Sequence, residues 1–264
     1  MNPFAAYDLT GRVAVITGAG SGIGRASANL LAAAGATVWC LDVDEAAATV
    51  TAEAIAADGG TANARRVNVV EKAEVDAAIA AVTAEHGRLD VMGNIAGVIK
   101  NQMLLDVSES DLDHLFGINL RGVFFGSQAA GRVMREQGSG SIINFASAAI
   151  DQPAPTVGVY AMTKAAVAMM TKTLAHEIAP VRVNAVAPGF TMSNMTNRHF
   201  MNPDGTEDPV RKAAIVQAMS ASSPIKRAGL PEDQAHLVLY LAADVSSFMT
   251  GQILRANGGV QMPW

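Results

Sequence analysis

Tyr160 and Lys164, a tyrosine and a lysine four residues apart, are the residues of this sequence best suited to acid–base chemistry. Positions i and i+4 of a helix share one face, so the lysine ammonium can lie beneath the tyrosine hydroxyl. A cation there favours phenolate over phenol and lowers the tyrosine pKa from its usual value of about 10. Ser147, thirteen residues before the tyrosine, adds a nearby hydroxyl. These three groups can form an acid–base device if the fold brings them together.

The elements that must position these residues follow from an alternation of apolar runs and helical patterns. Apolar runs typical of strands cover residues 13–17, 37–41, 64–69, 89–94, 141–146, 181–186 and 252–255. Helical spacing or strong helix formers occupy residues 22–35, 44–58, 71–86, 108–136 and 157–179. This alternation predicts an α/β fold with a doubly wound, mostly parallel seven-stranded sheet and helices on both faces. Since no linker or repeat divides the chain, we expect one domain over residues 1–264.

Composition excludes several classes of function. The formal net charge of −5 leaves no basic stripe for nucleic acid or for an anionic membrane. No apolar run reaches the length of a bilayer span, and residues 1–7 lack a basic and apolar leader. Cys40 is the single cysteine, so an internal disulfide is excluded and a cytoplasmic location is expected. The five histidines lack metal-ligand spacing, so we predict no metal site.

A glycine-rich turn after the first predicted strand indicates where a dinucleotide binds. Residues 17–24 read Thr-Gly-Ala-Gly-Ser-Gly-Ile-Gly and open the first predicted helix. Glycines let the backbone turn sharply and approach a pyrophosphate, and the helix N-terminus offers N–H groups to phosphates. Such a run is a weak signal alone and a strong one between a strand and a helix.

Asp42 indicates which dinucleotide binds. It ends the second predicted strand, where its carboxylate can accept hydrogen bonds from the adenosine ribose. The same charge disfavours a 2′-phosphate, because like charges about 4 Å apart cost about 4 kcal/mol at an effective dielectric of about 20. No cation occurs in the glycine turn or at Val43, and Arg25 projects from the first helical turn. We therefore predict NAD and not NADP.

The sequence resembles the short-chain dehydrogenase/reductase family over nearly its whole length, which implies a Rossmann-type fold. The matching motifs are Thr17-Gly-x-x-x-Gly-Ile-Gly24, Asn94-Ile-Ala-Gly97, Asn119, Ser147, Tyr160-x-x-x-Lys164 and Pro188-Gly189. Two positions depart from the family pattern: Ile95 replaces an asparagine, and Asn68-Val69 stands where an acidic residue is expected. Asn68 can still bond adenine through its amide.

The resemblance implies a role for each matching residue. Tyr160 would be the general acid in reduction and the base in oxidation, while Lys164 would lower its pKa and bind the nicotinamide ribose. Ser147 would polarise the substrate oxygen, and Asn119 would bind a water that continues a proton path from Lys164. Asn119 satisfied by backbone is the alternative. The implied cofactor-binding residues are Gly18, Gly20, Ser21, Gly22, Ile23, Gly24, Asp42, Val43, Asn68, Val69, Asn94, Ala96, Gly97, Tyr160, Lys164, Pro188, Gly189 and Thr191.

The predicted substrate end lies beyond the same strand ends. Its candidate walls are Val98, Ile99, Gln102 and residues 148–152. Residues 191–209 read as a mobile lid, in which Gly205 is a possible hinge. Its apolar side chains favour a largely apolar substrate or pack the lid onto the sheet: Met192, Met195, Phe200 and Met201. Arg198 and His199 could meet a carboxylate or a phosphate.

Two helices, 108–136 and 157–179, carry extra apolar residues, and the family pairs the corresponding helices across a two-fold axis. We therefore expect a homodimer or a homotetramer. The C-terminal tail ends in Trp264, which could fold over its own site or reach that of a neighbour.

Three functions compete. The leading hypothesis is an NAD-dependent enzyme that transfers hydride between nicotinamide and a secondary alcohol or ketone. The second is an NADPH-dependent 3-oxoacyl-thioester reductase of lipid synthesis. The third is a non-catalytic regulator that binds NAD(H), which has no reason to keep all four catalytic residues at their working spacing.

Overall fold

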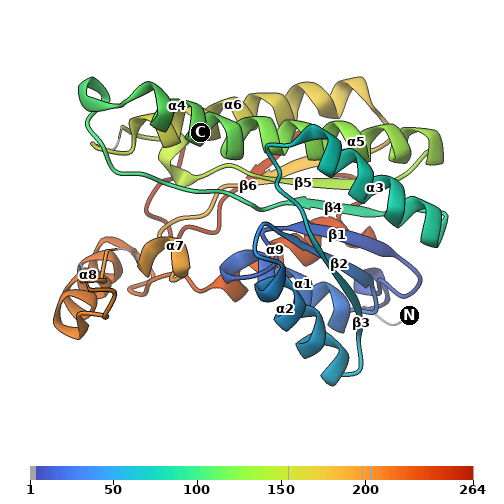
Figure 1. Ribbon diagram of the computed structural model, residues 1–264, viewed down its shortest axis with the longest axis horizontal. Helices are drawn as coiled ribbons and strands as arrows, with labels where there is room; N and C mark the ends of the chain where they lie inside the picture. Colours follow the sequence, from blue (N-terminus) through green and yellow to red (C-terminus); the bar gives the residue numbers. More distant parts are fainter. Residues whose placement is uncertain (1–3, 154, 198, 203, 264) are drawn as a thin grey trace.

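The computed structural model of the chain describes residues 4–153, 155–197, 199–202 and 204–263. Within them, seven parallel strands form one sheet in the order β3-β2-β1-β4-β5-β6-β7 (Figure 1). The strands are β1 (Val13–Thr17), β2 (Thr37–Asp42), β3 (Thr61–Arg66), β4 (Val91–Asn94), β5 (Ser141–Phe145), β6 (Arg182–Val186) and β7 (Ile253–Leu254). This confirms the predicted doubly wound α/β sheet, in which the strand order reverses between β1 and β4.

Helices cover both faces of the sheet (Figure 1). One layer contains α1 (Gly22–Ala33), α2 (Glu45–Ala57) and α9 (Pro231–Ala242). The other contains α3 (Lys72–His86), α4 (Glu109–Phe116), α5 (Val123–Gln137) and α6 (Gly158–Glu177). Two further helices, α7 (Asn194–Asn197) and α8 (Pro209–Ser222), project to the left of this body in Figure 1. Short 3-10 turns occur at Ala5–Tyr7, Leu104–Asp106, Ala148–Ile150 and Asp244–Ser246.

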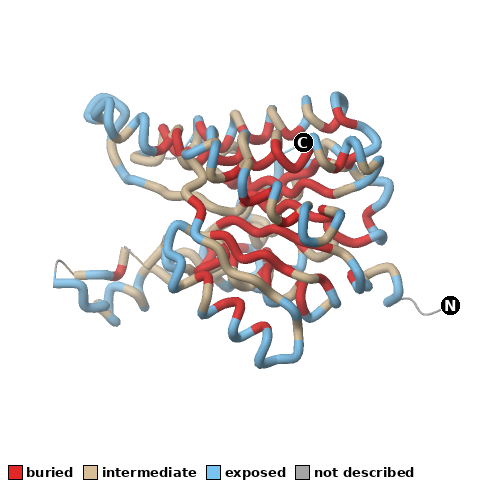
Figure 2. The backbone as a smooth tube through the Cα atoms, turned by 45° about the vertical axis from the view of Figure 1, so that its right-hand side comes forward, coloured by how far each residue is buried: buried red, intermediate tan, exposed pale blue. Residues whose placement is uncertain are grey.

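The core is divided between the two layers by the alternation of strand side chains. In β1, Val13 and Val15 pack with α3 and α5, whereas Ala14 and Ile16 pack with α1 and α9. All five residues of β1 are buried, as a strand covered on both faces requires (Figure 2). Because every strand pair is parallel, the carboxyl ends of the strands meet at one edge of the sheet.

The third strand lies earlier in the chain than the sequence indicates. The apolar run predicts a strand over residues 64–69, but β3 spans Thr61–Arg66 and leaves Asn68 and Val69 in the following loop. β3 is an edge strand whose residues are only partly buried, so polar side chains suffice there. The seventh strand is shorter than predicted.

The helix prediction needs two corrections. The predicted helix 108–136 is interrupted by a π-helical turn over Gly117–Gly122, which separates α4 from α5. α8 and α9 were not predicted, although each has a proline in its first turn. Asp208 accepts from the Arg211 N–H at the start of α8, and Asp233 accepts from the Leu230 N–H at the start of α9. These signals are present in the sequence.

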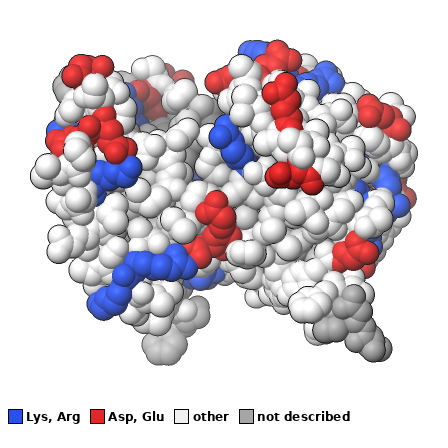
Figure 3. Space-filling model, turned by 90° about the horizontal axis from the view of Figure 1, so that it is seen from below, with Lys and Arg blue, Asp and Glu red and all other residues white. Residues whose placement is uncertain are grey.

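Charged side chains are dispersed on the surface. On the face drawn in Figure 3, acidic and basic residues are interspersed over a mainly uncharged surface. In the described part of the chain, none of the helices is both long and apolar enough to cross a membrane. The same residues contain no group of three or more metal-ligating side chains arranged to hold an ion.

Candidate active site

A cleft of about 2020 Å³ runs along the carboxyl ends of the strands. It brings together most of the residues that the sequence singles out. The predicted residues that line it are Gly18, Ser21, Gly22, Ile23, Gly24, Asp42, Val43, Asn68, Val69, Ala96, Gly97, Ser147, Tyr160, Lys164, Pro188, Gly189 and Thr191. Gly20, Asn94 and Asn119 lie behind this lining.

The glycine-rich turn connects β1 to α1 in a form that needs glycine. Gly18 has φ +69°, and a Cβ at Gly24 would lie 2.0 Å from the Gly18 carbonyl oxygen. Ser21 is the N-cap of α1 and makes no side-chain capping hydrogen bond in the described structure. Asp44, by contrast, caps α2 by accepting from the Ala47 N–H. The start of α1 therefore keeps backbone N–H groups for an anion.

Asp42 ends β2 beside this turn. One carboxylate oxygen accepts from the Gly20 N–H at 2.9 Å, and the other accepts from the Asp44 N–H at 3.0 Å. The guanidinium of Arg25 is bonded to the Gly20 carbonyl and, at 3.1 Å, to the Thr51 hydroxyl. Arg25 thus braces the glycine turn against α2.

Tyr160 and Lys164 lie on one face of α6, as their spacing predicts. The Lys164 ammonium lies 5.8 Å from the centre of the Tyr160 ring and donates to the Phe145 carbonyl at 2.8 Å. Lys164 is buried, and desolvation lowers its pKa to about 8. Tyr160 is 9% exposed. Lys164 thus joins α6 to the carboxyl end of β5, and both side chains line the cleft.

Ser147 follows β5 and starts a 3-10 turn. Its Oγ accepts from the Ala149 N–H at 3.1 Å, which holds the side chain in place at the turn. Because Ser147 Oγ is the acceptor in that bond, the hydroxyl hydrogen of Ser147 remains available to a partner in the cleft.

Asn119 lies in the π-helical turn, and its amide is bonded to the backbone of Val98 in both directions. Oδ1 accepts from the Val98 N–H at 2.9 Å, and Nδ2 donates to the Val98 carbonyl at 2.8 Å. A Cβ at Gly97 would lie 3.1 Å from Asn119 Oδ1 and 3.5 Å from Lys164 Nζ. The Asn119 side chain therefore holds residues 97–98 in place beside Lys164. This agrees with the alternative interpretation, in which backbone groups satisfy the buried amide. Its part in a proton path stays a prediction.

Asn94 and Asn68 take different positions from each other. The Asn94 amide donates to Ser127 Oγ at 3.1 Å and to Asn144 Oδ1 at 2.9 Å, so it points into the core behind the cleft. Asn68 lines the cleft, and its Oδ1 accepts from the Val70 N–H. Asn94 thus supports β4 and β5 from behind, whereas Asn68 lies on the cleft wall, where its predicted contact with adenine stays a prediction.

Gln234 is a site-supporting residue that the sequence analysis missed. It is fully buried on α9, where Nε2 donates to the Ala256 carbonyl at 2.8 Å and to Thr191 Oγ1 at 3.4 Å. It therefore connects the segment after β6 with the segment after β7. The available signal was a glutamine on the apolar face that Val238 and Leu241 continue.

The substrate end is broader than predicted. Val98, Ile99, Ala148, Ala149 and Gln152 line the cleft, but Gln102 turns away and donates to Asp111. In the segment predicted to be a lid, Met195 and His199 line the cleft, Phe200 is fully buried, and Arg198 lies outside the described residues. Wall residues that the sequence analysis missed include Pro155, Val157, Ile215, Met219, Ile225 and Val260. Trp264 also lies outside the described residues.

The doubly wound sheet, its glycine-rich turn and the cleft at the strand ends define a dinucleotide-binding protein of the Rossmann type. A family model described as enoyl-(acyl carrier protein) reductase matches residues 18–261. The short-chain reductase protein NovJ of Streptomyces niveus is 39% identical over 94% of this chain and 93% of its own length. The 3-oxoacyl-(acyl-carrier-protein) reductase FabG of Thermotoga maritima is 35% identical over 96% of this chain and 98% of its own.

Solved structures agree with these relatives. A gluconate 5-dehydrogenase from Burkholderia cenocepacia, in complex with NADP and tartrate, has a TM-score of 0.88 at 33% identity and covers 97% of both chains. A short-chain type dehydrogenase/reductase from Mycobacterium marinum has a TM-score of 0.88 at 34% identity, with 98% of both chains covered. The chain belongs to the short-chain dehydrogenase/reductase family, which confirms the resemblance, and it is an oxidoreductase that acts on CH–OH or C=O groups.

Proposed function

We propose that the chain is an NAD-dependent enzyme that transfers hydride between nicotinamide and a secondary alcohol or ketone of largely apolar character. The observation that carries the choice of NAD is the Asp42 carboxylate at the end of β2, held by the Gly20 and Asp44 N–H groups. A ribose diol can donate to this carboxylate, whereas a 2′-phosphate would be repelled by it. Arg25 is bonded to Gly20 and Thr51 and does not offset that repulsion.

The cleft residues fit a dinucleotide. The uncapped start of α1 and the turn from Gly18 to Gly24 would hold the pyrophosphate. Val43, Asn68 and Val69 would hold the adenosine half, and the nicotinamide half would contact residues 95–97 and 188–191. When bound, the nicotinamide ring supplies or accepts the hydride.

Tyr160 and its neighbours would handle the proton. The phenol gives a proton to the substrate oxygen in reduction and takes it back in oxidation. Lys164, beside the ring, stabilises the phenolate form by its charge and would bind the nicotinamide ribose. Ser147 donates its hydroxyl hydrogen to the same substrate oxygen. Asn119 keeps the Gly97–Val98 loop in place. It would also bind a water that continues the proton path from Lys164.

The wall of the substrate end supports an apolar substrate. Ile215 and Met219 of α8 face the cleft together with Met195 of the lid and Val260. These side chains discriminate among apolar shapes only weakly, at about 1–3 kcal/mol per methylene, so many ketones could enter. We propose that residues 191–209 move with α8 as a lid that excludes water after substrate binds.

A 3-oxoacyl-thioester reductase that uses NADPH is the second candidate. FabG reductases are among the relatives, at 35% identity in Thermotoga maritima and 37% in Staphylococcus aureus. The apolar wall would suit an acyl chain equally well. Asp42 counts against this candidate because of the 2′-phosphate of its cofactor.

We also propose a cytoplasmic homodimer or homotetramer. On the paired helices, Phe124 of α5 is 45% exposed and Met169 of α6 is 62% exposed, while Val123 and Val167 are buried in the core. Exposed apolar side chains on these faces support a partner subunit. Sedimentation of the purified protein over a range of concentrations tests this assembly.

Titration of the protein with NADH and with NADPH, followed by nucleotide fluorescence, tests the cofactor assignment. We expect tighter binding of NADH. Tighter binding of NADPH would overturn the interpretation of Asp42 and favour the thioester reductase. Turnover of a 3-oxoacyl thioester, compared with that of simple ketones, then separates the two candidates by substrate.

A further inference from the structure

The segment that carries Ser147 turns sharply as it leaves β5. Ser147 Oγ accepts from the Ala149 N–H, and the N–H of Asp151 donates to the Ala148 carbonyl at 3.1 Å. Ala148, Ala149 and Gln152 line the substrate end of the cleft. The position of the Ser147 hydroxyl therefore depends on where this turn is anchored.

The far end of the turn is anchored by an ion pair with the segment after β7. The Asp151 carboxylate accepts from Arg255 Nε at 2.7 Å and from Arg255 Nη2 at 2.8 Å, one oxygen for each nitrogen. Arg255 Nη1 also donates to the Ile253 carbonyl at 2.8 Å. The Asp151 side chain is 7% exposed and that of Arg255 is 27% exposed, so water screens the pair weakly. A bidentate pair of this kind fixes orientation as well as distance.

Arg255 lies at the start of a second stretch of cleft wall. Asn257, Gly258, Val260 and Gln261 follow it and line the cleft. The ion pair thus joins two segments, far apart in the sequence, that both border the cleft. It crosses the carboxyl end of β6, where the Ala148 N–H donates to the Pro188 carbonyl at 2.9 Å.

We propose that Asp151 and Arg255 are positioning residues, whose ion pair fixes the Ser147 turn against β7 and so holds the Ser147 hydroxyl in register with Tyr160. The inference rests on the proposed catalytic roles of Ser147 and Tyr160. A pair that only supported the fold would affect stability and cofactor binding. A positioning pair must instead affect kcat more than the Kd of NADH.

The test compares Arg255→Met with Arg88→Met. Arg88 makes the same bidentate contact, at 2.8 and 2.7 Å, with the buried Asp90 at the opposite edge of the sheet. With cofactor saturating, we expect Arg255→Met to lower kcat about 10- to 100-fold while the Kd of NADH stays at the wild-type value. Arg88→Met should keep the wild-type kcat. Arg255→Lys, which keeps the charge but loses the planar pair of donors, should recover part of the rate.

A second variant and a second readout complete the test. Asp151→Asn combined with Arg255→Met should be no slower than the worse single variant, because the two residues act as one pair. Amide hydrogen exchange of residues 148–151 should quicken in Arg255→Met while that of residues 18–24 stays unchanged. If Arg255→Met kept the wild-type kcat and the wild-type exchange, the proposal would be overturned. It would also be overturned if the variant lost stability and NADH affinity while kcat with saturating cofactor stayed unchanged.

The exchange readout also separates this proposal from the proposed function. It requires no turnover, so faster exchange at residues 148–151 would support the anchoring contact even if no substrate were found. Absence of turnover in the wild-type protein would instead count against the proposed reaction.

Discussion

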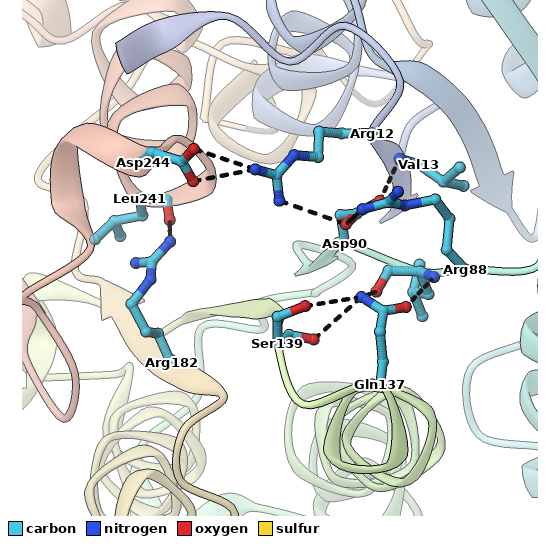
Figure 4. A network of polar contacts seen from close by, with 10 residues as sticks. Arg12, Val13, Arg88, Asp90, Gln137, Ser139, Arg182, Leu241 and Asp244 are labelled. Atoms are coloured by element: carbon cyan, nitrogen blue, oxygen red, sulfur yellow. Dashed lines mark hydrogen bonds and ion pairs between the residues drawn. The ribbon is translucent and has the colours of Figure 1, made fainter.

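The two edges of the sheet use polar side chains in opposite ways. At the amino edge they bond to one another, as Figure 4 shows. The buried Asp90 carboxylate accepts from Arg88 Nε and Nη2 and from the Val13 N–H at 2.9 Å. Arg12 lies between Asp90 and Asp244, 3.6 Å from the first and 3.1 Å from the second. At this edge, polar groups close the end of the core.

At the carboxyl edge, polar groups are held in place but directed into a cleft. Asp42, Ser147 and Lys164 each have one or two fixed protein contacts that orient them. The loops that follow the strands diverge at the point where the strand order reverses, and this leaves space for a ligand. The comparison teaches that the mutually bonded charges of the amino edge support the fold, while oriented groups that border the cleft support chemistry.

Tyr160→Phe should have the largest effect on the function of the carboxyl edge. Without the phenol hydroxyl, no group at that position can exchange a proton with the substrate oxygen. We expect turnover to fall about 10³-fold. NADH affinity should stay near that of the wild type. Steady-state kinetics together with a binding titration checks both values, and near-normal turnover would remove Tyr160 from the mechanism.

Lys164→Met should reveal the cost of burying an ammonium at this edge. Burial lowers the pKa of Lys164 from 10.5 to about 8, so the folded protein binds this proton less tightly than the unfolded chain does. As pH rises from about 8 to 10.5, the folded protein has released the proton while the unfolded chain still holds it, and stability increases. Over that window the wild type should gain up to about 3 kcal/mol relative to the variant. Urea unfolding at both pH values measures it; a constant difference would contradict burial as the cause.

Asp90→Asn should damage the amino edge and leave the reaction intact. The neutral amide can no longer satisfy both arms of Arg88 and the Val13 N–H. We expect a loss of about 2 kcal/mol in the free energy of unfolding, moderated because Arg88 and Arg12 are partly exposed and regain water. Denaturant unfolding and kcat are measured together. A fall in kcat at unchanged stability would contradict the division between the two edges.

Asp42→Asn should alter cofactor choice by a smaller amount. The amide keeps one acceptor for the Gly20 N–H and removes the charge that repels a 2′-phosphate. Since the site is partly exposed and screened, we expect the affinity for NADPH relative to NADH to rise about 10-fold. Parallel titrations measure the ratio. If it does not change, another group determines the choice of cofactor.

Much of the carboxyl edge could be predicted from the sequence because its requirements are local. The turn from Gly18 to Gly24 needs glycine where the backbone approaches itself, and Tyr160 and Lys164 meet through one helical turn. The continuous apolar run over residues 13–17 likewise made β1 recognisable. These features depend on neighbours a few residues apart.

Contacts between distant segments could not be predicted in the same way. Nothing near Asp151 indicates that Arg255 reaches it, since the contact exists only once β5, β6 and β7 are adjacent. The sequence misplaced β3 because an edge strand can be polar. The amide of Asn119 bonds to the backbone of Val98, which lies twenty-one residues earlier in the chain. Gln234 was missed because its partners, Thr191 and Ala256, come from two other segments.

Reduction of NAD⁺ and of NADP⁺ by the wild-type protein, across a panel of secondary alcohols, tests the central claim most directly. The panel should span hydroxyacyl thioesters, steroids, terpenoids and sugars, with the appearance of reduced nucleotide followed by absorbance. We expect turnover of apolar secondary alcohols with a higher kcat/KM for NAD⁺ than for NADP⁺. Turnover with NADP⁺ alone, or none with any alcohol or with the corresponding ketones, would contradict the account.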